Sequence, residues 1–205
     1  MTEIGREAMS DFDVKDVCYP KIGSLITEAD ALLLQKCCGI ADAKTILEIG
    51  TKRGGSAIVL AKEVEKRKGR LYCMDPNFNA NLAGDLEDFE VDHLIELICG
   101  YSPWAGRGIV PDELDMLWID GDHSILGALA DFIYWEPRVR VGGVVAFHDY
   151  SRRGVVPKTA SVETAVDLIL HERKDLEEIG FVGKPDGGTI AFQKTALPEL
   201  DDSNV

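Results

Sequence analysis

Acidic and imidazole side chains gather at two places in the second half of the sequence. Asp120, Asp122 and His123 follow one short apolar run, and His148 and Asp149 end the next one. If the two runs are neighbouring strands, these groups meet at one rim. Such ligands suit magnesium, manganese or iron better than a structural zinc ion. The alternative is that Asp122 caps the following helix, one histidine is a hydrogen-bonding residue, and no metal binds.

A glycine-rich turn in the first half of the chain is typical of ligand binding. Residues 48–56 read EIGTKRGGS, where Gly50 allows a sharp turn and Gly54 lets backbone approach a ligand. A dinucleotide fingerprint requires glycine at the position of Lys52, which argues against NAD. Glu48 ends an apolar strand and needs a donor or a cation, such as the ammonium group of an amino acid.

A second acidic residue stands at the end of the next apolar run. Asp75 lies where a carboxylate accepts both hydroxyls of a ribose, and Tyr101 and Ser102 follow a third run, where they would border an adenine. The alternative for each residue is a purely structural role, since acids at strand ends often cap helices. Together the three strand ends predict a nucleoside-containing ligand with an amino-acid end.

The elements that position these residues alternate between strand and helix. Runs apolar on consecutive positions predict strands buried on both faces, at 45–50, 70–75, 94–99, 115–120, 143–149 and 189–194. Helices are predicted at 56–68, 124–139 and 161–179, after a leading helix that begins at the capping pair Thr27 and Asp30 and ends near Gly39. We predict a doubly wound, Rossmann-like α/β fold with a mostly parallel sheet and helices on both faces.

Length and composition predict one globular domain in a chain of 205 residues, 45% of them hydrophobic. We expect a flexible segment or flap at 1–20, the domain at 21–195 and an acidic tail at 196–205. The five cysteines, Cys18, Cys37, Cys38, Cys73 and Cys99, form no CxxC pair, so we expect them to be reduced and buried.

Charge and hydropathy restrict the partners. With 22 basic and 36 acidic residues the net charge is −14, which disfavours nucleic acid and anionic membranes. No apolar run approaches the roughly 18 residues of a spanning helix, and the N-terminus lacks a signal core. We expect a cytoplasmic protein with a small-molecule partner, and leave open whether it forms a homo-oligomer.

Three segments together carry a family resemblance. ILEIGTKRGGS (46–56), Asp75, and LWIDGDHS (117–124) with GGVVAFHDY (142–150) resemble the class I S-adenosylmethionine-dependent methyltransferases, in particular small-molecule O-methyltransferases and methyltransferase family 24. The resemblance covers about residues 20–195. It implies S-adenosylmethionine as cofactor, and the predicted cofactor-binding residues are Glu48, Gly50, Thr51, Gly54, Ser56, Asp75, Tyr101, Ser102 and Asp120.

The metal ligands follow from the same resemblance. In catechol-type O-methyltransferases an aspartate ends the fourth strand and an aspartate-asparagine pair ends the fifth. Asp120 and Asp149 match, but Tyr150 replaces the asparagine, so the third ligand falls to His148 or Asp122. We predict magnesium or manganese held by Asp120, Asp149 and His148.

The resemblance also places a lysine base three residues after the first aspartate, where this chain has His123. An unperturbed pKa of about 6.5 suits this residue for proton removal near neutrality. We predict His123 and Asp120 as catalytic residues. His148 is the rival base, but alternation along a strand points it to the opposite face from Asp149.

The predicted function is methyl transfer from S-adenosylmethionine to an oxygen of a small molecule, such as a sugar or polyketide hydroxyl. Arg152, Arg153 and Lys158 make one loop locally basic, which favours an anionic acceptor unless they are ordinary surface residues. Two alternatives stay open. One is a metal-dependent hydroxylase related to the cephalosporin hydroxylase group, with an iron triad of two histidines and a carboxylate. The other is a non-catalytic binding protein.

Overall fold

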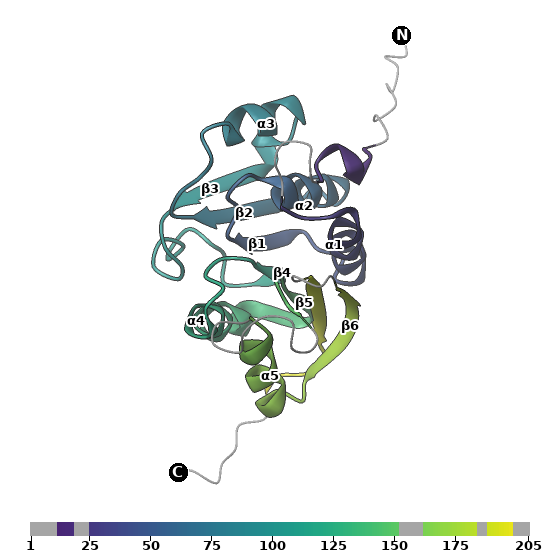
Figure 1. The fold of residues 1–205 in the computed structure, drawn as a ribbon, viewed down its shortest axis with the longest axis vertical. Coiled ribbons are helices and arrows are strands. Elements are labelled where there is room, and N and C mark those ends of the chain that lie inside the picture. Colours follow the sequence, from purple (N-terminus) through teal and green to yellow (C-terminus); the bar gives the residue numbers. More distant parts are fainter. Residues whose placement is uncertain (1–11, 19–24, 152–161, 184–187, 199–205) are drawn as a thin grey trace, which may run out of the picture.

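A computed structural model describes residues 12–18, 25–151, 162–183 and 188–198, and its strands form one sheet (Figure 1). The order is β3-β2-β1-β4-β5-β7-β6, with β7 antiparallel to both neighbours and the first five strands parallel. This confirms the predicted Rossmann-like fold class. The strands are β1 (Thr45–Ile49), β2 (Arg70–Asp75), β3 (Ile95–Cys99), β4 (Leu114–Ile119), β5 (Val139–Phe147), β6 (Leu176–Val182) and β7 (Thr189–Lys194).

Helices cover both faces of the sheet (Figure 1). One face carries α1 (Glu28–Ile40) and α2 (Gly55–Lys66), and the other carries α4 (Ile125–Trp135) and α5 (Val162–Glu172). A short helix, α3 (Leu82–Asp88), is part of the connection from β2 to β3 along the chain. The predicted capping box at the start of α1 is present, with Thr27 and Asp30 each accepting from the other's backbone. No helix in these described parts is long and apolar enough to cross a membrane.

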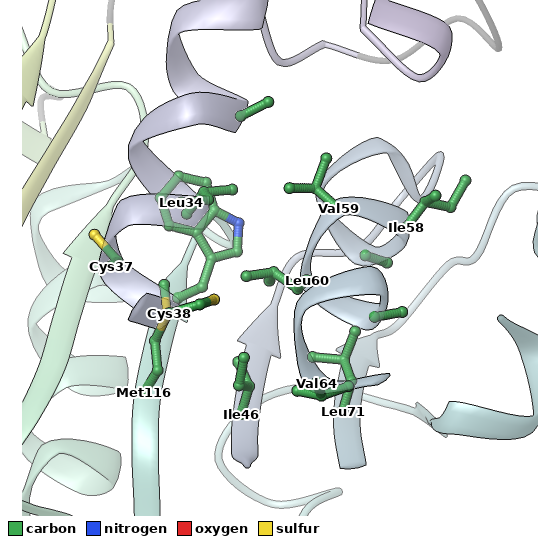
Figure 2. Close-up of a cluster of buried hydrophobic side chains, with 14 of the residues drawn as sticks. Leu34, Cys37, Cys38, Ile46, Ile58, Val59, Leu60, Val64, Leu71 and Met116 are labelled. Carbon is green, nitrogen blue, oxygen red and sulfur yellow. The ribbon is translucent and has the colours of Figure 1, made fainter. Parts of the chain in front are cut away.

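Strand alternation divides the core into two clusters. On the first face, Ile46 and Leu71 pack beneath α1 and α2 (Figure 2). On the second, Leu47 and Ile49 pack with residues of α4 and α5. Because helices cover both faces of the sheet at β1, apolar side chains of this strand are buried on both sides.

One predicted helix and one predicted burial are wrong. The stretch predicted as a single helix at 161–179 ends at Glu172 and then forms β6. β6 is an edge strand with mostly half-exposed side chains, so it carries no buried apolar run. Cys99 is exposed on β3, the other edge strand, whereas the remaining four cysteines are buried as expected.

Part of the predicted N-terminal flap is packed against the domain. A 3-10 turn spans Val14–Asp16, and Val17 is fully buried. Phe12 lies edge-on to Phe89, with ring centroids 6.4 Å apart. Described structure therefore begins before residue 21. Residues 1–11, 19–24 and 199–205 lie outside the described parts.

Candidate active site

A cavity of about 350 Å³ opens at the carboxyl ends of the parallel strands. Its wall is formed by the ends of β1 and β2, the turns after β3 and β4, and one side of α4. Four predicted cofactor residues lie in this wall: Gly50, Asp75, Tyr101 and Ser102. Ligands of open α/β sheets bind at such a crevice, and the volume falls within the range of small-molecule sites.

Asp75 is held rigidly at the edge of this cavity. Its Oδ2 accepts from the backbone N–H of Lys52 at 2.8 Å, and its Oδ1 accepts from the N–H of Asn77 at 2.7 Å. Each carboxylate oxygen has a further lone pair for a ligand. Lys52 has a φ of 45°, so the turn after β1 adopts a left-handed conformation there and aims its N–H at Asp75. The turn thus orients the carboxylate predicted to hold a ribose.

Gly50 is required by close packing of backbone. Its φ is 90°, and a Cβ at this position would run into the carbonyl oxygen of Asp120. The N–H of Asp120 donates to the carbonyl of Ile49 at 2.8 Å, which joins the ends of β1 and β4. Gly50 therefore brings the glycine turn against the segment that carries the acidic and imidazole groups.

Glu48 faces away from the cavity. Alternation along β1 places it on the α2 side, while Ile49 lines the cavity on the α4 side. The carboxyl group is fully buried and accepts from Thr51 at 2.8 Å and from Ser56 at 2.5 Å. Cys73 approaches it at 3.1 Å. Burial outweighs these hydrogen bonds and raises the pKa of Glu48 to about 7.

Three more predicted cofactor residues lie on this second side of the turn. Thr51, Gly54 and Ser56 line a small hollow of about 20 Å³, distinct from the main cavity. The structure therefore divides the predicted cofactor set between two sides of the glycine turn. Thr51 and Ser56 both donate hydrogen bonds to Glu48, so the Glu48 carboxylate connects the glycine turn to the start of α2.

Asp120, His123 and Asp149 come together beyond the cavity wall formed by Gly121 and Asp122. The Nε2 of His123 is 3.4 Å from Oδ1 of Asp120, and its Nδ1 is 3.0 Å from Oδ2 of Asp149. One ligand atom from each of the three residues lies within 4.8 Å of the others, so the group can hold a metal ion. Its histidine is His123, whereas the sequence assigned that place to His148.

Asp149 reaches the cluster because the chain leaves the strand conformation there. β5 ends at Phe147, and Asp149 has a φ of 54°, in the left-handed region. Strand alternation therefore does not govern Asp149. As a result, both His148 and Asp149 lie near Asp120. Nδ1 of His148 is 3.1 Å from Oδ1 of Asp120 and 3.6 Å from Oδ1 of Asp149.

His148 lies behind the cluster. Its ring is buried, with Nδ1 3.1 Å from Oδ1 of Asp120 and Nε2 3.9 Å from Oδ2 of Asp30. Asp30 also accepts from the hydroxyls of Thr27 and Thr189. The capping acid of α1 thereby supports the rim through His148, a connection that the sequence analysis did not identify.

The charges of this network stabilise one another. Burial opposes ionisation of Asp120, but hydrogen bonds from His123 and His148 outweigh it and lower its pKa. The hydrogen bond to Asp120 raises the pKa of His123 against the effect of burial. Burial also opposes protonation of His148, yet hydrogen bonds to Asp120 and Asp30 raise its pKa to about 10. The rim favours positively charged groups between its carboxylates.

Asp131 is a cavity residue that the sequence analysis missed. It lies on the face of α4 that forms the cavity wall and is only 5% exposed. The sequence feature that could have identified Asp131 is its position as the single charged residue in the apolar stretch ALADFIYW of the predicted helix. Of the predicted basic loop, Arg152, Arg153 and Lys158 fall outside the described residues.

A family model for methyltransferase domains, methyltransferase family 24, matches residues 47–150, just over half of the chain. This range contains the glycine turn, the cavity wall and the whole Asp120, His123 and Asp149 cluster. The chain belongs to this methyltransferase family, as the resemblance predicted.

Solved structures of O-methyltransferases share the fold. The Streptomyces achromogenes enzyme TomG of tomaymycin synthesis, solved with S-adenosylmethionine, superposes with a TM-score of 0.65 at 24% identity, covering 86% of this chain and 83% of that one. The Bacillus cereus O-methyltransferase, in complex with S-adenosylhomocysteine, gives a TM-score of 0.67 at 21% identity, covering 82% of each chain.

A curated relative is uncharacterized protein R132 of Acanthamoeba polyphaga mimivirus. It is 28% identical over an alignment of 118 residues, which covers 53% of this chain and 52% of that protein. The chain thus spans about half the length of this relative.

Proposed function

We propose that this methyltransferase transfers the methyl group of S-adenosylmethionine to an oxygen atom of a small molecule. The observation that carries the proposal is the adjacency of two sites along one sheet edge. A nucleoside-sized cavity with Asp75 in its wall lies beside the Asp120, His123 and Asp149 cluster. Methyl transfer requires a donor and a nucleophile held side by side.

The donor's nucleoside is assigned to the main cavity. Asp75 already faces the cavity with its carboxylate held by two backbone N–H groups, so little ordering is needed when hydroxyls donate to it. The glycine turn supplies close backbone approach between that cavity and the rim. Bound S-adenosylmethionine would supply an electrophilic methyl group, and it is also the ligand held by the similar TomG structure.

The acceptor oxygen is assigned to the rim. His123 is about half exposed, so it is open to an entering hydroxyl, and its ring is oriented by carboxylates on both sides. In its neutral form the ring takes a proton from the hydroxyl as the oxygen attacks. A magnesium or manganese ion held by the carboxylates of Asp120 and Asp149 would stabilise negative charge developing on that oxygen, leaving the ring lone pair of His123 for the proton.

The types of metal ligand at the rim argue against the hydroxylase alternative. An iron site of that kind takes two histidines and one carboxylate. The three groups that fit a metal here are two carboxylates and one histidine, while His148 is directed at Asp120 and Asp30. An oxygen-rich set favours magnesium or manganese, and therefore methyl transfer.

Calorimetry with the purified protein tests the cofactor assignment. We expect heat of binding with S-adenosylmethionine and S-adenosylhomocysteine, and none with NADH. Absence of heat with both sulfur ligands contradicts the proposal.

A divalent ion at the rim is tested by titrating manganese into the EDTA-treated protein and following its electron paramagnetic resonance signal. Asp149→Asn should weaken manganese binding at least tenfold, because the carboxylate charge is lost. Asp112→Asn is the control, since Asp112 is a fully exposed acid that precedes β4, at the opposite end of this strand from the rim. Equal manganese binding by both variants would leave His123 as a base without a metal.

A further inference from the structure

Asp131 is a buried carboxyl group at the cavity wall that the proposed chemistry does not yet use. It belongs to α4, and only 5% of the residue is exposed. Acids of this kind are rarely buried without a partner. Burial raises the pKa of Asp131 to about 6 against the effect of the Ser102 hydrogen bond, so the group is ionised in neutral buffer.

The hydrogen bonds around Ser102 fix the direction of each donor. The indole N–H of Trp135 donates to Oγ of Ser102 at 2.9 Å. The hydroxyl proton of Ser102 is therefore available to donate to Asp131, which is its side-chain partner. A carboxylate has about four lone pairs, and Ser102 occupies one of them. Asp131 thus offers hydrogen-bond acceptors, and no donor, to a ligand in the cavity.

The surroundings of Asp131 fit a flat, mostly apolar ring. Ile49 and Met74 contribute apolar side chains to the same cavity, and Gly121 lies directly beside the carboxylate. A Cβ on Gly121 would come within 3.3 Å of Oδ2 of Asp131 and 3.0 Å of Ile49. The missing side chain at 121 keeps this end of the cavity open next to the acid.

The two acids line the same cavity but come from different elements. Asp75 ends β2, whereas Asp131 lies on α4 and pairs with Ser102 of the turn after β3. A ligand that reaches both needs a diol at one end and a hydrogen-bond donor on a planar ring at the other. Adenosine has both features, with its ribose hydroxyls and its exocyclic amino group.

We propose that Asp131 is the specificity-determining residue for the base of the methyl donor, accepting a hydrogen bond from the adenine amino group. Ser102 acts as its positioning residue. This inference rests on the proposed function, because it concerns the cofactor of that same site. Hypoxanthine carries a carbonyl oxygen in place of the amino group, and that oxygen would face the carboxylate without a proton between them.

The test compares S-adenosylhomocysteine with its deaminated analogue S-inosylhomocysteine by calorimetry at pH 7.5. The wild-type protein should bind the adenosyl compound about ten- to a hundredfold more tightly, the range expected for one hydrogen bond to a charged group. Asp131→Asn, whose amide can donate to a carbonyl oxygen, should reduce that preference to less than threefold or reverse it. A matched control is Asp112→Asn, a fully exposed acid that should keep the wild-type preference.

Three results separate the possible failures. Equal affinity of the wild-type protein for both compounds overturns the role of Asp131, as does an unchanged preference in D131N. Binding of neither compound overturns the proposed function itself. If D131N lacks a cooperative melting transition, D131S, which keeps a hydroxyl toward Ser102 without the charge, is measured in its place and should also lose the preference. A purely structural role for Asp131 would alter stability and leave the ratio of the two affinities unchanged.

Discussion

Replacing Glu48 by glutamine should change how the stability of the protein depends on pH. The carboxyl group is fully buried beneath α2, with Thr51 and Ser56 donating to it. Burial raises its pKa from an ordinary 4.5 to about 7. Glutamine has nearly the same shape but does not ionise, so Glu48→Gln removes this titration and keeps the packing.

The raised pKa of Glu48 determines how the free energy of unfolding changes with pH. A carboxyl group whose pKa is raised on folding binds protons more tightly in the folded than in the unfolded chain. Its stabilising contribution is complete below pH 4.5 and is lost as the pH rises through about 7. At about 1.4 kcal/mol per pH unit, the gap between these two values corresponds to roughly 3 kcal/mol. Relative to wild type, Glu48→Gln should therefore gain up to about 3 kcal/mol between pH 4.5 and 8.

Urea unfolding of the ligand-free proteins at several pH values measures this difference. Glu96→Gln serves as the control, because Glu96 lies on the edge strand β3 in an exposed ion pair with Arg70. Its stability relative to wild type should vary little over the same range. A Glu48→Gln difference that stays constant, or that falls with pH, would mean that Glu48 is held ionised, and the reasoning from burial would be refuted.

The same variant tests whether Glu48 receives the ammonium group of the methyl donor, as the sequence suggested. A cation beside Glu48 would favour its ionised form. Saturating S-adenosylhomocysteine should then abolish the pH-dependent difference between wild type and Glu48→Gln. Because the carboxyl group faces α2 and not the main cavity, we expect the difference to persist.

Three further substitutions address the donor site, the reacting group and the glycine turn. Asp75→Ala should weaken S-adenosylmethionine binding by roughly 1 to 3 kcal/mol in calorimetry through loss of charge-assisted hydrogen bonds; unchanged affinity would remove Asp75 from the donor site. His123→Ala should lower turnover by about 10²- to 10⁴-fold with nearly unchanged donor affinity, and turnover within a factor of about three excludes it as the base. Gly50→Ala should lower the free energy of unfolding by more than about 2 kcal/mol in urea, because its Cβ would meet the Asp120 carbonyl; a smaller loss would show that the turn can move.

The sequence predicted the inner strands well because each is covered on both faces. β1, β2 and β4 are short segments with apolar residues on most consecutive positions, and the structure buries most of their residues. β6 lacks this signal. At the edge of the sheet, with partly exposed side chains, its residues LEEIGFV follow the helical pattern of α5 without a visible break. Such an edge strand is identified by its hydrogen bonds to a neighbouring strand. For β6 this neighbour is β7, and their pairing becomes visible only in the structure.

The sequence also predicted which strand ends carry polar groups, but not the direction of every side chain. Alternation along β1 turns Glu48 toward α2, which becomes evident only when Ile49 is known to line the cavity. The left-handed backbone at Asp149 brings its carboxylate to His123, and no feature of the sequence FHDY specifies that conformation. Asp131 could have been suspected as an isolated acid in an apolar helix. Its pairing with Ser102 depends on how β3 and α4 meet.

The charges at the rim favour occupation by a divalent cation. Three carboxylates, those of Asp30, Asp120 and Asp149, surround the two rings of His148 and His123. With His148 protonated, as its pKa of about 10 requires near neutrality, a proton on His123 still leaves the group with one net negative charge. A divalent ion held by Asp120 and Asp149 in place of that proton, with His123 neutral, would bring the net charge to zero. In the proposed reaction such an ion would also lie beside the oxygen that becomes negative, so the same cation would balance the charge of the rim and stabilise the reacting oxygen.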